Sequence, residues 1–178
     1  MKYVIMHSVL LLAGCNAPNP THTVVGEIEQ PVQPATSSAW MYTDLDPFVQ
    51  IDGMTSNQLI GLFGKMHHAD QKWRDSLHSG KSENEKLFLQ KMHANDEVNL
   101  KILNRVIKKY GWPKKSSLGE EAAETAWLII WHHRSNRHIL CRHFDEMEKE
   151  ARAGEMSAAL FQQIKDQIDI LSPDQIDY

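Results

Sequence analysis

The sequence lacks the short motifs that mark most large enzyme families. It contains no G-x-S-x-G, no phosphate-binding loop, no dinucleotide fingerprint and no H-E-x-x-H. It has ten histidines, but none of those on the predicted helices stand three or four residues apart, the spacing at which one helix presents two metal ligands. We therefore predict no cofactor and no dedicated metal site. A site assembled across helices, with His132 and Asp70 or Asp96 as first ligands, is the open alternative.

The sequence also has no excess of positive charge. It carries 19 Lys and Arg residues against 23 Asp and Glu residues, for a net charge of -4. Because nucleic-acid-binding domains carry a basic face, we predict no nucleic-acid partner. The 178 residues suffice for one domain with a sizeable core, but not comfortably for two.

The N-terminus has an apolar run that is too short to span a membrane. Lys2 precedes the mostly apolar run Val4 to Leu12, which is much shorter than the ~20 residues that a membrane-spanning helix needs. We predict that residues 1–14 are a signal peptide. The following tetrad, Leu12-Ala13-Gly14-Cys15, resembles the lipobox of bacterial lipoproteins.

The lipobox resemblance implies cleavage before Cys15, lipidation of Cys15 with palmitate among its acyl chains, and membrane attachment through that lipid. Asn16 follows the cysteine where Asp would favour retention in the inner membrane. The resemblance therefore implies a location in the outer membrane of a double-membraned bacterium, facing the periplasm. An ordinary export signal is the alternative. With Cys15 lipidated, Cys141 has no disulfide partner in the chain, and we expect it to be buried as a small hydrophobic residue.

Beyond Cys15 the sequence divides into a tether and a helical domain. Residues 15–52 are rich in Pro, Ser and Thr and poor in large apolar side chains, which is typical of a flexible segment. The apolar residues between Trp40 and Ile51 predict that the end of this segment packs on the domain. Residues 53–178 show helical periodicity without a period-2 run, which predicts an all-α bundle of four to five helices.

Three predicted helices begin at capping boxes, each with a hydroxyl residue and a Glu or Gln three residues later. The boxes are Thr55 to Gln58, Ser82 to Glu85 and Ser117 to Glu120. The second helix should end at Gly111, before Pro113. The third, from Ser117 to Phe144, is apolar on nearly every side at first, so we expect the other helices to pack around it. It is either continuous or broken near Arg134, in which case Asn136 is a natural N-cap.

Five polar residues fall on the inner faces of the predicted helices. Asp70 lies on the apolar stripe of the first helix, with Arg74 one turn later where an ion pair is natural. Asp96 and Asn99 interrupt the stripe of the second helix, and His132 ends the apolar run of the third. Because buried polar groups need partners, we expect these residues to meet in a polar centre.

The same residues suggest a family. Asp70-Gln71-x-x-Arg74, Asp96-x-x-Asn99, Gly111-Trp112-Pro113 and an apolar run into His132 resemble an uncharacterised bacterial family with the motifs Asp-Gln-x-x-Arg, Asp-x-x-Asn, Gly-Trp-Pro and Gln-His. Trp131 stands where that family has Gln. The resemblance covers about Ala69 to His132 and implies an all-helical fold, but no reaction.

These observations favour an exported, lipid-anchored module that binds an envelope protein or a small molecule, or supports the envelope structurally. The first alternative is a hydrolase in which His132 is the general base, Asp70 or Asp96 orients it and Arg74 holds an anionic group. A metal-binding lipoprotein is the second. A structural role for the polar centre, fixing how the helices pack, is the reading that we favour over both.

Overall fold

The helical periodicity after Thr55 produces seven α-helices and no strand in the residues that the computed structural model describes, 41–79 and 84–171. The all-α prediction is confirmed. All of these residues belong to one unit, residues 33–178. The predicted signal peptide, Cys15 and most of the tether lie outside the described residues. The helices are α1 (Ser56–His78), α2 (Glu85–Tyr110), α3 (Lys115–Leu118), α4 (Glu120–His132), α5 (Arg137–Arg142), α6 (Phe144–Arg152) and α7 (Ala158–Ile170).

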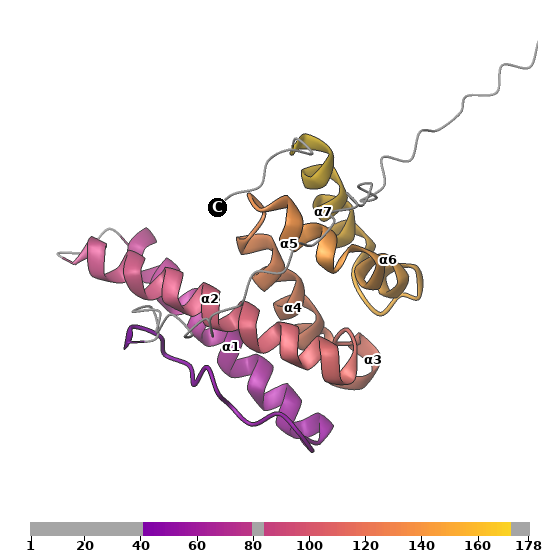
Figure 1. The fold of residues 1–178 in the computed structure, drawn as a ribbon, viewed down its shortest axis with the longest axis horizontal. Helices are drawn as coiled ribbons and strands as arrows, with labels where there is room; N and C mark the ends of the chain where they lie inside the picture. Colours follow the sequence, from indigo (N-terminus) through magenta and orange to yellow (C-terminus); the bar gives the residue numbers. More distant parts are fainter. Residues whose placement is uncertain (1–40, 80–83, 172–178) are drawn as a thin grey trace, which may run out of the picture. The chain divides into compact units, whose positions relative to one another are not determined.

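The two long helices form an antiparallel pair (Figure 1). Contacts between Ala69 and Asn95 and between Met66 and Asn99 run in opposite directions along α1 and α2. The facing stripes bury Phe63 and Met66 of α1 against the inner side of α2, which includes Ile102. This pair, with α4 packed against both of its helices, holds most of the polar residues predicted from the sequence.

The predicted helix ends are partly right. The Thr55–Gln58 box caps α1 as expected, with both reciprocal hydrogen bonds formed. Gly111 ends α2 with a φ of 82°, a left-handed conformation that glycine adopts without strain. Ser82 of the second box lies outside the described residues, and Asn84 at the start of α2 makes no side-chain cap.

The third capping box is wrong. Ser117 belongs to the separate helix α3 and donates to the carbonyl of Lys114, while α4 begins only at Glu120. Gly119 lies between the two helices with a φ of 88°, outside the right-handed helical region. The left-handed glycine turns the chain before a Ser117 cap can form.

The central segment is also not buried on every side. Trp127 and Leu128 of α4 are only half-buried, and the chain breaks at residues 133–136. Asn136 then caps α5, its side chain accepting from the N–H of Ile139 at 3.2 Å. This break, with those at Gly119 and His143, explains why there are seven helices where four to five were predicted. Cys141, expected to be buried, is half-buried on α5.

Helices α5, α6 and α7 pack on one another, and α5 contacts α4 (Figure 1). Tilted rings of Phe144 and Phe161, with centroids 5.2 Å apart, join α6 to α7. The carbonyl of Leu160 accepts from the indole of Trp127, which ties α7 to α4.

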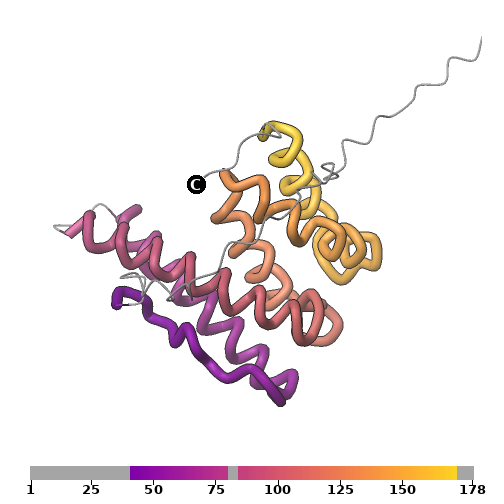
Figure 2. The backbone as a smooth tube through the Cα atoms, viewed as in Figure 1, coloured from indigo at the N-terminus to yellow at the C-terminus, as the bar shows by residue number. Residues whose placement is uncertain are grey.

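Residues 41–54, here called the arm, run alongside α1 and α2 as turns and irregular chain (Figure 2). Arg105 of α2 donates to the carbonyl of Val49 at 2.8 Å, and the Tyr110 hydroxyl donates to that of Ile51 at 2.6 Å. Ile51 is buried, whereas Met41 and Phe48 are exposed. Arg105 is therefore half-buried beneath the arm.

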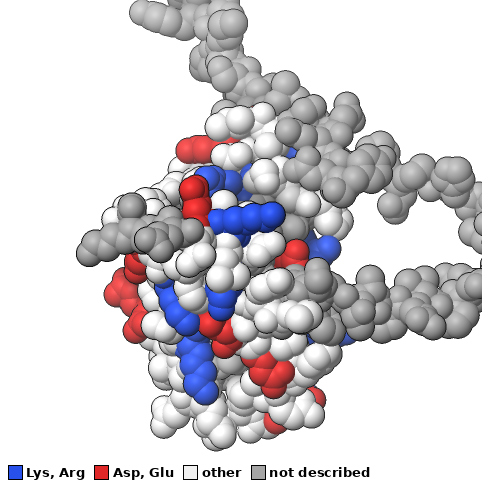
Figure 3. All heavy atoms as spheres, turned by 90° about the vertical axis from the view of Figure 1, so that its left-hand side faces the viewer, with Lys and Arg blue, Asp and Glu red and all other residues white. Residues whose placement is uncertain are grey.

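Within the described part of the chain, no helix has the length and apolar character needed to cross a bilayer. Cationic and anionic side chains are intermixed on the face drawn in Figure 3.

Candidate functional site

Three helices bring four of the predicted residues together. Asp70 and Arg74 come from α1, Asp96 from α2, and His132 is the last residue of α4. Their positions follow from helix geometry, because Asp70 and Arg74 are one turn apart on the side of α1 that faces α2. We call this set of four residues the polar cluster.

Arg74 is the centre of the polar cluster. Its Nη2 lies 2.8 Å from both carboxylate oxygens of Asp96, and its Nη1 donates to the backbone carbonyl of Asp70 at 2.7 Å. The same Nη1 is 3.5 Å from Oδ1 of Asp70, so the predicted one-turn ion pair is present. One guanidinium thus joins α1 to α2 through two carboxylates of which only 1% and 11% of the side-chain surface is exposed.

Asp70 in turn joins α1 to α4. Its Oδ2 accepts from Nε2 of Gln71 at 2.6 Å and lies 3.0 Å from Nε2 of His132. Because an ionised carboxylate only accepts, this contact places a proton on Nε2 of His132, and in the neutral form of the imidazole the lone pair is then on Nδ1. Oδ1 of Asp70 is buried without a hydrogen bond. His132 retains 15% of its side-chain exposure.

Burial shifts the pKa of two groups around the cluster. Burial raises the pKa of Asp96 above its usual range, although the Arg74 guanidinium opposes that rise. His133 directs Nε2 toward the backbone carbonyl of Asp96 at 3.3 Å, and burial lowers the pKa of its imidazole. His133 therefore favours its neutral form, and the only permanent cation of the cluster is Arg74.

Asn99 lies apart from these four residues. It is fully buried and donates to the carbonyl of Met66 at 3.2 Å, while its own oxygen has no hydrogen bond. The expectation of five residues in one polar centre is therefore too broad. The structure gathers four, and places Asn99 as a separate link between α1 and α2.

The sequence analysis missed Asn95, which is also fully buried. Its amide donates to the carbonyl of Ala69 at 2.7 Å, and its oxygen accepts from the N–H of Asp44 at 2.8 Å and the hydroxyl of Thr43 at 3.1 Å. Asn95 thus fastens the arm to α1 and α2. The sequence spacing could have identified Asn95 as buried, because Asn95, Asn99 and Ile102 recur at helical spacing on the buried face of α2.

The polar cluster does not line any of the cavities described here. A groove of about 940 Å³ lies between the arm and α1 and includes Asp44, Val49, Gly61 and Lys65 in its walls, but no member of the cluster. Among residues 41–79 and 84–171, no three His, Cys, Asp or Glu side chains are placed to hold a metal ion together. The contacts of the polar cluster connect three helices, α1, α2 and α4.

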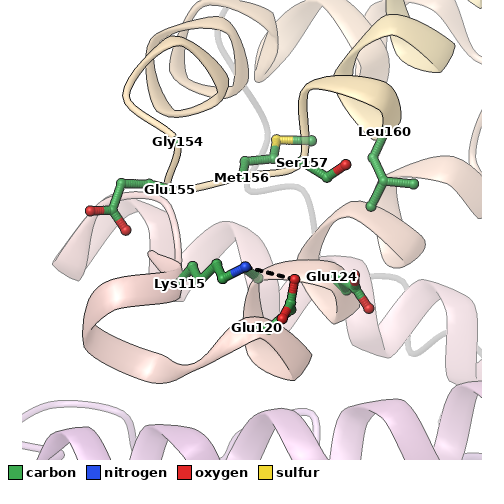
Figure 4. Close-up of a pocket in the computed structure, with 9 residues that line it drawn as sticks. Lys115, Glu120, Glu124, Gly154, Glu155, Met156, Ser157 and Leu160 are labelled. Carbon is green, nitrogen blue, oxygen red and sulfur yellow. Dashed lines mark hydrogen bonds and ion pairs between the residues drawn. The ribbon is translucent and has the colours of Figure 1, made fainter.

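A smaller cavity of about 230 Å³ lies between the start of α4 and the segment leading into α7 (Figure 4). Lys115 pairs with Glu120 at 2.7 Å on the side of the cavity formed by α3 and α4, and Met156 and Leu160 contribute apolar walls on the other side. Glu155 is held by Ser116, whose N–H and hydroxyl donate to its carboxylate. Much of the charge at this cavity is already paired.

The chain matches no family model, no curated protein and no solved structure. The resemblance to the uncharacterised bacterial family stays a prediction from the motifs.

Proposed function

We propose that this protein is an exported, lipid-anchored helical module of the cell envelope, which binds a ligand or partner on a surface held rigid by the polar cluster. The observation that carries the proposal is the position of Arg74, which contacts carboxylates of two helices while a third helix is attached through Asp70 and His132. Groups that satisfy one another in this way fix helix packing, which favours binding or support over chemistry at the cluster.

The anchoring half of the proposal rests on Leu12-Ala13-Gly14-Cys15 and the preceding apolar run. It is tested by labelling cells of a double-membraned bacterium that express the full chain with radioactive palmitate. We expect label in the wild-type protein and in Cys141→Ser, and none in Cys15→Ser. Cys141→Ser is the matched control, since it removes the other cysteine of the chain. Label that persists in Cys15→Ser would refute the anchor.

A hydrolase is the second candidate, and one specific contact favours it. The carboxylate of Asp70 holds Nε2 of His132 at 3.0 Å, which orients the imidazole and leaves Nδ1 as a base. Asp70 would be the positioning residue and His132 the base.

Hydrolysis of p-nitrophenyl butyrate by the wild type and by His132→Asn tests this candidate. A hydrolase should lose roughly a hundredfold or more of its rate in the variant, because general bases contribute about that much. Equal rates in the two proteins would remove this candidate and leave the binding module.

A further inference from the structure

We propose that the groove between the arm and α1 binds a single-chain fatty acid, with its alkyl chain along α1 and its carboxylate at Lys65. This inference deepens the proposed function by naming a ligand class for the module. It rests on the lining of the groove, on the pairing of the arm's polar groups and on the charges at the groove's edge.

The walls of the groove are mainly apolar. Its floor contains the buried residues Leu62, Ala69 and Ile102, and the arm contributes Leu45, Val49 and Met54. A volume of about 940 Å³ falls in the usual range of small-molecule sites. The floor residues are already buried, so an apolar ligand in this groove would mainly shield the partly exposed side chains of Leu45, Val49 and Met54 from water.

Two glycines open the groove on the side of α1. Gly61 and Gly64 lie within the helix, and a Cβ built on either one would meet no atom within 4 Å. Each glycine costs an exposed helix about 0.5–1 kcal/mol relative to alanine, and the packing of the described chain does not require either one. Both leave the helix backbone open to close approach by a ligand.

The dimensions of the groove fit a medium-length alkyl chain. From Gln58 to Ala69, the lining residues cover eleven steps of α1, which is roughly 16 Å at the helical rise per residue. Because the C–C bonds of about 1.5 Å zigzag, an extended alkyl chain advances only about 1.25 Å per bond, and a chain of roughly twelve to fourteen carbons has a similar length.

The arm offers few free hydrogen-bonding groups to a peptide. The N–H groups of Asp44, Phe48 and Met54 already donate to Asn95, Asp46 and Tyr110. The carbonyls of Val49 and Ile51 already accept from Arg105 and Tyr110. A bound peptide strand would bury backbone groups without partners, which is costly, whereas an alkyl chain has no such groups.

Charge at the edge of the groove favours an anion. The carboxylate of Asp44 is engaged by Lys72 and Trp73, and that of Asp46 by the N–H of Phe48. Lys65 has no ion-pair or hydrogen-bond partner among the described residues, and His68 lies one turn further along the same edge. The unpaired charge of the groove is therefore positive, which suits a carboxylate head group.

Calorimetric titration of the full chain with submicellar decanoate tests the proposal. We expect saturable binding that weakens at least about tenfold in Gly64→Leu, whose side chain fills the groove. Binding should be unchanged in Ala159→Leu, which adds a leucine side chain at an exposed position of α7. Circular dichroism verifies folding of each variant. Gly61→Leu is the second blocking variant if Gly64→Leu does not fold.

The contact between the carboxylate head group and Lys65 is tested by comparing decanoate with decan-1-ol, which has no carboxylate. Lys65→Gln should weaken decanoate binding roughly threefold and leave binding of decan-1-ol unchanged, while Lys86→Gln, at an exposed position of α2, should affect neither ligand. Absence of saturable decanoate binding, or equal affinity in Gly64→Leu, overturns the site. Equal affinities for decanoate and decanol, with no effect of Lys65→Gln, overturn the assignment to a fatty acid. None of these results bears on palmitate labelling at Cys15, so failure of the ligand and failure of the anchor are distinguishable.

Discussion

Arg74 and Asp96, from neighbouring helices, meet with one guanidinium nitrogen 2.8 Å from both oxygens of the carboxylate. The side chains retain only 14% and 11% of their exposure, so the pair is largely withdrawn from water. Since Arg74 also contacts Asp70, removing its charge would leave two carboxylates without their cation.

We therefore expect Arg74→Met to lower the free energy of unfolding by about 3–5 kcal/mol, the usual cost of breaking a buried pair from one side. Urea denaturation at pH 7 measures the change. Arg152→Met is the matched control, because Arg152 pairs with Glu148 on the surface with 77% of its side chain exposed. The control should lose less than about 1 kcal/mol. A loss in Arg74→Met no larger than in the control would show that the polar cluster does not hold the helices.

His143 makes the stability depend on pH. It is buried at the start of α6, with Nε2 2.7 Å from the side-chain oxygen of Asn104. Burial, assisted by the nearby charge of Arg142, lowers the pKa of His143 to about 4. Because this pKa lies below the unfolded value of about 6.5, the unfolded chain binds more protons between the two values. The contribution of His143 is thus fully present above pH 6.5 and is lost as the pH falls toward 4.

The expected loss from His143 between pH 7 and pH 4 is on the order of 3 kcal/mol. His143→Gln removes the titrating group, so its unfolding free energy should fall less steeply over this interval than that of the wild type. Urea denaturation at several pH values measures both slopes, and carboxylate titration is common to the two proteins. Parallel slopes would contradict the assigned pKa shift.

Asn95 should control the attachment of the arm. Asn95→Ala removes one buried hydrogen bond to Ala69 and part-buried ones to Thr43 and Asp44, so we expect a loss of about 1–3 kcal/mol. It should also speed hydrogen exchange at the Asp44 amide, measured by NMR or mass spectrometry. Asn99→Ala is the control, because Asn99 contacts α1 without touching the arm. Equal exchange at Asp44 in the two variants would show that Asn95 does not hold the arm.

The break after α4 depends on Asn136. Its side chain satisfies the N–H of Ile139 at the start of α5, and replacing such a cap by alanine costs about 1 kcal/mol. We expect this loss in Asn136→Ala by thermal or urea denaturation. Ser135→Ala alters the neighbouring exposed residue, which makes no cap, and should change stability by less than about 0.5 kcal/mol. Comparable losses in both variants would argue against a capping role.

The sequence by itself determined the features that depend on spacing along one helix. Helical periodicity predicts the all-α class, Thr55 and Gln58 predict the start of α1, and Gly111 predicts the end of α2. The Asp70–Arg74 contact follows from one-turn spacing alone. Each of these features depends on residues within a few positions of one another, so it can be predicted without knowing how the helices pack.

Only the tertiary structure decided how separate segments meet. It joins Asp96 to Arg74, places Asn99 outside the polar cluster and uses the unpredicted Asn95 to hold the arm. It also separates α3 from α4 at Gly119, where the sequence pattern predicted a capping box. The relative rotation of two helices selects which polar residue of a stripe finds a partner across the interface. Spacing within either helix carries no information about that rotation.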